Sequence, residues 1–407
     1  MAESTVAPVY DPAAPAVIRD PYPALLALQR DDPAHFSPQL KAWILTRWED
    51  VRRALDAPEM SVDRIRPFYE GLPKLERDVL SEVVRYLTLW LVFRDPPEHT
   101  RLRKLMGRAF TLTAVEGLRP NVEAIADELI GRMADLGGEV DFVAEFAMPL
   151  PAYVIMDLLG VPRARMAAMK AWSDEMQLFI GSARGAPDKY AKASHGAHEM
   201  AALFRGLIAE RRTEPRDDLI SKFIAARDAD DALSEDEMVA ACMLVLFGGH
   251  ETTTNLLSTG FLKFMRHPEQ AQRLRGEPGI APLAVEECLR LDGPSGAMAR
   301  LVGEAHEVHG KRLEAGDRVF AMLNAANMDP EVFDRPQDFD VGRKPNRHVT
   351  FGYGTHFCMG AMLARLEGEV AFTRLVARFP DARPAGEPDW HRTIIMRGPS
   401  RLPVRLG

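Results

Sequence analysis

One short loop concentrates the residue types that could do chemistry, the decapeptide FGYGTHFCMG at positions 351–360. Its two glycines, Gly352 and Gly354, permit a turn with positive φ. Cys358 lies just before a predicted helix, where the helix dipole and free N–H groups favour a thiolate over a thiol. Such a thiolate could be a nucleophile with His356 as its base, or a metal ligand. Residues two apart near a helix start do not have to point together, which weakens the nucleophile interpretation.

A second cluster lies in the middle of a long apolar segment, in the run FGGHETTT at positions 247–254. The run SEDE at 234–237 fits a capping box with Ser234 as the N-cap, and His267-Pro268 would end the helix after Arg266. That helix would have about 32 residues and a length of about 48 Å. Two adjacent glycines inside it cost about 1 kcal/mol each relative to alanine.

This costly composition allows two interpretations. In the first, the hydrogen-bond ladder opens locally, and the glycines let a flat ligand approach the backbone. Glu251 and Thr252 would then place an acid and an alcohol beside the gap, where they could form a proton path. In the second, the glycines only permit close packing, and Glu251 is a satisfied buried side chain.

The composition fits a globular protein that can enclose both clusters. Of its 407 residues, 46% are hydrophobic and 27% charged, which excludes disordered, fibrous and small disulfide-stapled classes. The 51 basic and 59 acidic residues give a net charge of −8, so no general attraction to nucleic acid is expected. The longest apolar run, 238–247, is too short to cross a bilayer, and residues 1–20 contain no secretion signal. We expect a cytoplasmic protein without a membrane anchor.

The elements that must position these clusters are mainly helices. Helical periodicity dominates from about residue 50 to 290, and a last helix is predicted from about 361 to 379. A short strand is predicted at 43–46, and the other strands are expected after residue 300, where short runs alternate with glycine and proline. No long polar linker divides the chain. We therefore predict a mainly α fold with a smaller β-rich part late in the chain, as a single domain over 1–407.

Four motifs together resemble those of the cytochrome P450 superfamily. FGYGTHFCMG is similar to its haem-binding signature, and GGHETT at 248–253 is similar to its oxygen-activating motif in the long central helix. The run ECLR at 287–290 matches its ExxR pair, and DPPEHTRLR at 95–103 resembles the start of a helix that crosses the haem in bacterial members. The resemblance extends from about Trp43 to Val404. It implies the cytochrome P450 fold of the soluble bacterial type, without a fused reductase.

The resemblance also implies a role for each matched residue. Cys358 would be the axial thiolate ligand of the iron of haem b, a ligand that donates electron density to the metal. Glu251 and Thr252 would deliver protons during oxygen activation. The residues expected to contact the haem are His99, Arg103, Arg300, Phe351, His356 and Gly360. The expected structural ion pair is formed by Glu287 and Arg290, with Arg343 as a third member. The expected substrate-binding residues are Leu244, Phe247, Gly248, Gly296, Met298 and Ile395.

The implied activity is that of a haem-thiolate monooxygenase. It would insert one oxygen atom from O2 into a lipophilic small molecule, by hydroxylation or O-dealkylation. Electrons derived from NAD(P)H would come from a ferredoxin or flavodoxin, and the protein itself is expected to be a monomer. The donor would dock on a basic patch near the cysteine, for which the candidates are Arg103, Lys104, Arg108, Arg343, Lys344, Arg347 and Arg365.

Three alternatives stay open on the sequence alone. A haem-thiolate protein could bind a gas or another ligand without turnover, although the Glu251-Thr252 pair argues against that. Peroxide-driven oxidation or isomerisation would keep the haem and change the reaction. A cysteine hydrolase would use Cys358 and His356 without haem.

Overall fold

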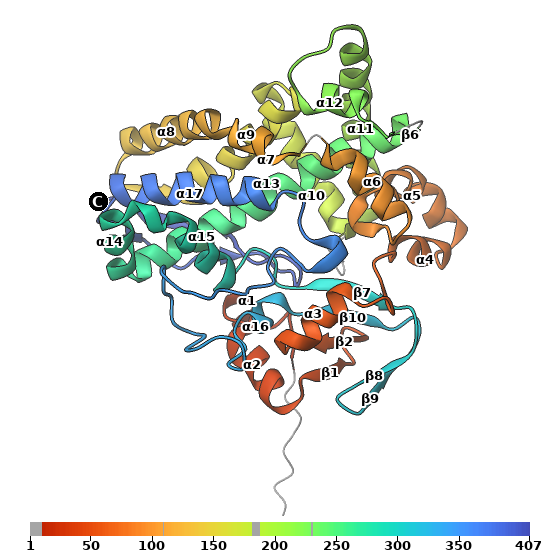
Figure 1. Ribbon diagram of the computed structural model, residues 1–407, viewed down its shortest axis with the longest axis horizontal. Helices are drawn as coiled ribbons and strands as arrows, with labels where there is room; N and C mark the ends of the chain where they lie inside the picture. Colours follow the sequence, from red (N-terminus) through yellow and green to blue (C-terminus); the bar gives the residue numbers. More distant parts are fainter. Residues whose placement is uncertain (1–9, 109, 181–187, 229–230) are drawn as a thin grey trace, which may run out of the picture.

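The computed structural model describes residues 10–108, 110–180, 188–228 and 231–407. Helices form most of this structure, as predicted, and a smaller sheet part lies to one side of them (Figure 1). The α-helices are α1 (Pro15–Arg19), α2 (Tyr22–Asp31), α3 (Trp48–Asp56), α4 (Ile65–Glu70), α5 (Lys74–Leu87), α6 (Glu98–Gly107), α7 (Leu112–Glu116), α8 (Arg119–Leu136), α9 (Pro149–Leu159), α10 (Met166–Ile180), α11 (Lys189–Thr213), α12 (Leu219–Ala225), α13 (Glu235–Arg266), α14 (Pro268–Gly276), α15 (Ala281–Arg290), α16 (Leu323–Ala326) and α17 (Ala361–Arg378).

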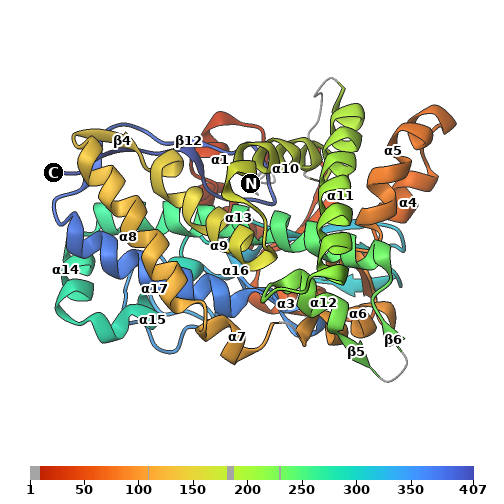
Figure 2. The same ribbon diagram turned by 90° about the horizontal axis from the view of Figure 1, so that it is seen from above.

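The predicted long helix is α13, which has 32 residues. It starts with the expected capping box: the Glu237 N–H donates to the Ser234 hydroxyl (3.3 Å), and the Ser234 N–H donates to the Glu237 carboxylate (2.8 Å). It ends at Arg266, directly before His267 and Pro268. Most of its side chains are buried, because α9, α11, α15 and α17 all pack against it. Figures 1 and 2 show α8 and α17 lying side by side along it.

The two glycines of α13 have different environments. A Cβ at Gly249 would lie 2.6 Å from Cδ1 of Ile155, so this glycine permits close packing against α9. A Cβ at Gly248 would meet nothing within 4 Å, so this position leaves open space beside the helix. The helix continues without interruption through both positions. The predicted opening of its hydrogen-bond ladder is therefore wrong, since packing against α9 holds the segment in helical geometry. The close approach of a ligand to a glycine stays a prediction for Gly248.

The main sheet has the strand order β1-β2-β10-β7-β3. The β2–β10 pair is parallel and the other neighbouring pairs are antiparallel. The strand predicted at 43–46 is confirmed as β2. The expectation that the strands gather late in the chain is wrong in part, because three strands of this sheet come from the first 61 residues. Its strands are β1 (Ala34–Ser37), β2 (Ala42–Leu45), β3 (Met60–Ser61), β7 (Met298–Val302) and β10 (Arg318–Ala321).

The remaining strands are short and stabilise connections between helices. β4 (Glu139–Asp141), β14 (Pro403–Arg405) and β11 (Arg383–Pro384) form a sheet that places the C-terminal segment beside the end of α8. The hairpins are β5 (Arg227–Asp228) with β6 (Asp231–Ala232), β8 (His306–Val308) with β9 (Lys311–Leu313), and β12 (Asp389–Trp390) with β13 (Pro399–Arg401). Within the described ranges, no helix combines the length and the apolar character needed to span a membrane.

Candidate active site

The loop that carries Cys358 has the predicted turn. Gly352 and Gly354 have φ values of 76° and 62°, in the left-handed region that favours glycine. The Cys358 N–H donates to the Phe351 carbonyl (2.8 Å), which closes the loop on itself. The helix α17 starts three residues after the cysteine, as expected. The loop is also tied to α6, because the Arg103 guanidinium donates to the Phe357 carbonyl (2.7 Å).

The Cys358 side chain is accessible but lies in surroundings that exclude most bulk water. It is exposed, whereas Cys242 and Cys288 are buried. Burial raises the pKa of the Cys358 thiol, while the backbone N–H of Gly360 and the charge of Arg103 act to lower it. A Cβ at Gly360 would lie 4.0 Å from the cysteine sulfur, so the glycine leaves room beside that atom. An accessible sulfur near N–H donors and positive charge is suited to bind a metal as a thiolate.

Four predicted haem-contacting side chains lie in one group. α6 carries His99 and Arg103 one turn apart, β7 carries Arg300, and the cysteine loop carries His356. The ring centroids of His99 and His356 are 4.1 Å apart. His99 is only 1% exposed, yet neither of its ring nitrogens has a hydrogen-bond partner. Within the described structure, the Arg300 guanidinium donates only to two backbone carbonyls (3.0 and 3.4 Å).

This group contains donors and positive charge without a matching acid. Burial lowers the pKa of His99 to about 4, that of His356 to about 3 and that of Arg300 to about 10. Buried donors that lack acceptors are unfavourable, so the group suits an acidic ligand. The two propionates of haem are such a ligand, and charge-assisted hydrogen bonds would satisfy these side chains. The residues present therefore fit a haem held against Cys358. Phe351, also expected at the haem, is 7% exposed and lies beneath the Arg365 guanidinium at 4.6 Å.

The expected ion-pair network is centred on the carboxylate of Glu287. Arg290 binds it with two hydrogen bonds of 2.8 Å, and both side chains are fully buried. Arg343 joins through its Nε at 3.1 Å, and the amide of Asn346 donates at 3.2 Å. Arg290 also donates to the carbonyls of residues 327, 336 and 338. The network thus fixes the segment that leads from residue 327 into the cysteine loop.

A second carboxylate network was missed by the sequence reasoning. Glu286 accepts from Arg365 of α17 (2.6 Å) and lies 3.1 Å from Nε2 of His348. Burial acts to raise the pKa of Glu286, but these two partners lower it to about 2. Arg365 therefore holds an internal carboxylate, as Arg343 does, and both of these docking candidates are at least partly engaged inside the protein. The only signal in the sequence was a second acid directly before the ExxR motif.

Glu251 and Thr252 are adjacent in α13 and face different surroundings. The Thr252 hydroxyl donates to the Gly248 carbonyl (2.8 Å). Burial raises the pKa of Glu251 to about 7, while the charge of Lys170 opposes and that of Asp174 reinforces this shift. Lys170 and Asp174 form an ion pair on α10. A carboxyl group with a pKa near neutrality can both accept and release a proton at physiological pH.

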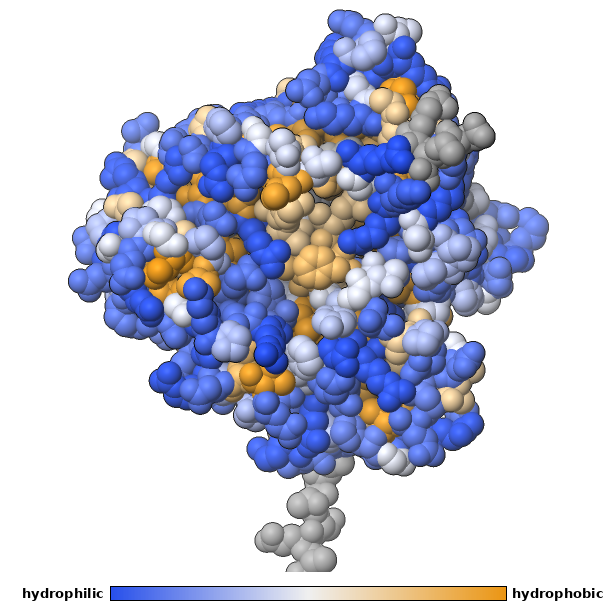
Figure 3. Space-filling view, in the orientation of Figure 1, coloured by the Kyte–Doolittle hydropathy of each residue, from blue (hydrophilic) through white to orange (hydrophobic). Residues whose placement is uncertain are grey.

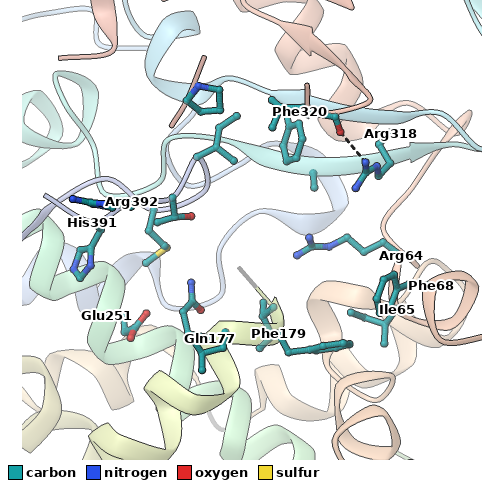
Figure 4. Close-up of a pocket in the computed structure, with 18 of the residues that line it drawn as sticks. Arg64, Ile65, Phe68, Gln177, Phe179, Glu251, Arg318, Phe320, His391 and Arg392 are labelled. Atoms are coloured by element: carbon teal, nitrogen blue, oxygen red, sulfur yellow. Dashed lines mark hydrogen bonds between the residues drawn. The ribbon is translucent and has the colours of Figure 1, made fainter. Parts of the chain in front are cut away.

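A cavity of about 1460 Å³ lies between α4, α10, α13 and the main sheet. Figure 4 shows Glu251 and Gln177 on one side of it, Phe320 of the sheet on another, and Arg64 extending into it. Its walls come from segments far apart in the sequence. Sequence reasoning missed Arg64, Gln177 and Phe179, because no motif or period distinguishes them from surface or core residues.

None of the six residues expected to bind substrate is in the lining of this cavity. Ala299 and Ile394, which adjoin Met298 and Ile395 in the chain, line it instead, and Thr254 lines it from α13. Phe247 packs on the buried Trp90 ring, with centroids 5.2 Å apart. The residues concerned are Leu244, Phe247, Gly248, Gly296, Met298 and Ile395, whose role stays a prediction.

The comparisons with known proteins agree with the geometry of the site. A sequence model of the family described as Cytochrome P450 matches residues 76–278 and 280–392. The chain is 41% identical over 378 residues to cytochrome P450 107B1 of Saccharopolyspora erythraea, covering 90% of each chain. It is 38% identical to vitamin D(3) 25-hydroxylase of Pseudonocardia autotrophica, covering 96% of this chain and 94% of that one. Among solved structures, cytochrome P450 PksS of Bacillus subtilis has a TM-score of 0.87 and 32% identity, covering 98% of this chain and 100% of that one.

These matches exclude the cysteine-hydrolase alternative. The matched regions contain Cys358, Glu251 and the ExxR pair, and they span well over half of the chain. The relatives include proteins named as hydroxylases, such as vitamin D(3) 25-hydroxylase and 6-deoxyerythronolide B hydroxylase. The chain therefore belongs to the cytochrome P450 family, and it is an oxidoreductase that uses haem b, O2 and electrons from a redox partner.

Proposed function

We propose that this protein is a monooxygenase that hydroxylates or O-dealkylates a lipophilic small molecule held in the cavity beside α13. The observation that carries the proposal is the position of Glu251, whose carboxyl lies in the cavity wall next to Thr252 and titrates near neutral pH. A protein that only binds a gas has no need of a proton donor there. We also propose that the whole chain acts as one haem-binding domain, since α6, α13, β7 and α17 all contribute to the site.

The roles of the residues follow from their contacts. Cys358 would ligate the haem iron, and His99, Arg103, Arg300 and His356 would hold the propionates. The bound haem would supply the oxygen chemistry. Glu251 would take up a proton from water in the cavity and pass it towards Thr252, its neighbour on α13. The Thr252 hydroxyl donates its hydrogen to the Gly248 carbonyl, so its oxygen is left to act as an acceptor. Thr252 would therefore accept a hydrogen bond from a ligand or a water molecule beside α13.

The cavity has room for a lipophilic substrate larger than an ordinary drug-sized molecule. Its volume of about 1460 Å³ exceeds that of an ordinary drug-sized site. Apolar side chains from several elements form much of its wall, among them Ile65, Phe179 and Met396. The related vitamin D(3) 25-hydroxylase is named for a large lipophilic substrate, which is consistent with this class.

A ferredoxin or flavodoxin is the proposed electron donor, docking on the face that carries the cysteine loop. Figure 3 shows an apolar area near the centre of this face, bordered mostly by hydrophilic side chains, where the start of α17 lies in Figure 1. Phe357 is 40% exposed in this loop. The exposed members of the predicted basic patch are Lys104, Arg108, Lys344 and Arg347. An apolar centre with a basic rim suits an acidic protein donor.

The deciding experiment combines a spectrum with turnover. The reduced carbon monoxide complex is expected to show a thiolate-type Soret band, and a ferredoxin, its reductase and NADPH should convert a lipophilic substrate with one O2 consumed per product. A band without any oxygenated product, whatever the donor and substrate, would indicate a haem protein that only binds ligands.

A second experiment tests the docking face. The double variant Lys344→Glu/Arg347→Glu should slow reduction by ferredoxin about tenfold or more and leave reduction by dithionite unchanged.

A further inference from the structure

Arg64 is a positively charged side chain that projects into the cavity without a partner. It lies directly before α4, and Figure 4 shows its guanidinium extending from the wall into the open space. Its contact with the protein is a cation–π contact, 4.9 Å from the centroid of Phe93. Within the described parts of the chain, no carboxylate lies within 4 Å of it and no acceptor takes its hydrogen bonds. Burial, with no opposing charge, lowers the pKa of Arg64 to about 10.

The nearby acids are already engaged. Asp95 accepts from the Ser61 hydroxyl (2.5 Å) and from the Val62 N–H (3.0 Å). Asp63 pairs with Arg66 at 3.3 Å. The acids on the α10 and α13 side, Glu251 and Asp174, lie across the cavity from Arg64, where Figure 4 places Glu251. Of the side chains that the structure describes in this wall, none forms an ion pair with Arg64.

The haem does not account for this charge either. Its two propionates carry two negative charges, and the group that fits them contains two arginines, Arg103 and Arg300. Arg64 lines the same cavity as Arg300, and its charge, after the larger effect of burial, acts to lower the pKa of that arginine. It is a third cation beyond the two that the propionates would neutralise.

Apolar side chains of α4 and α10 line the cavity on one side of Arg64. Ile65 and Phe68 of α4 line the cavity beside it, and Phe68 makes an edge-to-face contact with Phe179 of α10 at 5.7 Å. A purely apolar ligand would displace water from the guanidinium and leave its five donors unsatisfied, which is unfavourable. A ligand that is apolar along its length and carries one carboxylate would satisfy both parts of the wall, because a carboxylate matches the planar fork of an arginine.

We propose that Arg64 binds the carboxylate of the substrate, so that this protein acts on lipophilic monocarboxylic acids. The inference rests on the proposed function of the cavity as the substrate site. The acid group is anchored at the α4 side, away from Glu251 and Asp174, and the apolar remainder of the molecule lies along the α10 and α13 walls. The carboxylate is a recognition group and is not itself oxidised.

The test compares an acid with the alcohol of the same length. Binding of decanoic, dodecanoic and tetradecanoic acid and of the corresponding 1-alkanols to the haem-loaded protein is measured by calorimetry. At least one acid should bind roughly 10- to 100-fold more tightly than its alcohol. Arg64→Gln should abolish this preference while alcohol binding stays within about twofold, and Arg64→Lys should restore part of it. The matched control is Arg392→Gln, which removes an exposed arginine from another part of the same cavity wall and should keep the preference.

Three results would overturn the inference. The wild-type protein could bind each acid no more tightly than its alcohol. Arg64→Gln could weaken acid and alcohol equally, or it could lower the haem content of the purified protein, and either result would assign Arg64 to the fold or to a propionate. Failure of the proposed function is recognised separately, by the lack of a thiolate-type carbon monoxide band or of oxygenated product, because calorimetric binding does not depend on turnover.

Discussion

Glu287→Gln tests how strongly the ExxR network holds the cysteine loop. The substitution keeps the size of the side chain, so it leaves no cavity and removes only the negative charge. In the wild-type protein this carboxylate accepts from Arg290, Arg343, Asn346 and the backbone N–H of Asp340 (3.0 Å). A glutamine would turn an NH2 group towards one set of these donors. Both arginines would then lie next to each other without an acid between them.

The expected loss of stability is large. Removing one partner of a fully buried ion pair costs about 3–5 kcal/mol, because the remaining charge stays buried without compensation. A typical domain is stable by only about 5–15 kcal/mol, so the variant should lose a substantial part of its free energy of unfolding. The neighbouring Glu286→Gln is the matched control. Its side chain is 23% exposed and holds two partners, so its loss should be about 1–2 kcal/mol.

Urea denaturation followed by far-ultraviolet circular dichroism measures both variants. Glu287→Gln should have the lower midpoint of the two, and its haem content after purification should fall because the cysteine loop is no longer held. Equal midpoints for the two variants would refute the reasoning, since they would show that the fully buried pair is worth no more than the partly exposed one.

Three further outcomes are expected. Because burial raises the pKa of Glu251 to about 7, the folded state holds this proton more tightly than the unfolded chain, and wild-type stability is lost as pH rises from about 4.5 to 7. Glu251→Gln should remove this loss. Its free energy of unfolding relative to the wild-type protein, measured by urea denaturation, should therefore be about 1–3 kcal/mol more favourable at pH 8 than at pH 4. Gly249→Ala should destabilise the fold by about 1–3 kcal/mol through overpacking against Ile155, and should therefore lower the thermal midpoint. Gly248→Ala, measured in the haem-free protein, should raise the thermal midpoint. Equal shifts of the two midpoints would contradict the packing role of Gly249. Cys358→Ser should abolish the thiolate-type carbon monoxide band, and a surviving band would mean that another residue binds the iron.

Features fixed by local chemistry could be predicted from the sequence. The capping box at Ser234, the end of α13 before Pro268 and the glycine turns beside Cys358 depend on neighbouring residues only, and all of them occur in the structure. The convergence of His99 and His356 depended on the resemblance to a known family, because nothing in the spacing of positions 99 and 356 brings them together.

Features fixed by tertiary packing could not be predicted in this way. Whether α13 opens or stays helical at its glycines depends on packing against Ile155 of α9, and a single sequence does not reveal that neighbour. Arg365 reads as a surface cation, since the acid that holds it, Glu286, lies on α15, many residues away in the chain. β1 and β3 are too short to show a period, and they become strands because β2 and β7 supply their partners.

The two adjacent acids of α15 explain why substitutions should have different effects in the cysteine loop and in the cavity wall. Glu287 holds the segment that enters the loop, and Glu286 holds His348 and the helix that leaves it, so the position of Cys358 is fixed from both sides by ion pairs, one fully buried and one partly exposed. Among the residues that the structure describes, Arg64 forms no ion pair with an acid, and α4 meets α10 through an edge-to-face aromatic contact. A substitution in this wall costs few interactions within the protein. A substitution in this wall can therefore change which ligand binds without affecting the cysteine loop. Arg64→Gln should alter substrate preference far more than the free energy of unfolding. Glu287→Gln should alter the free energy of unfolding far more than substrate preference.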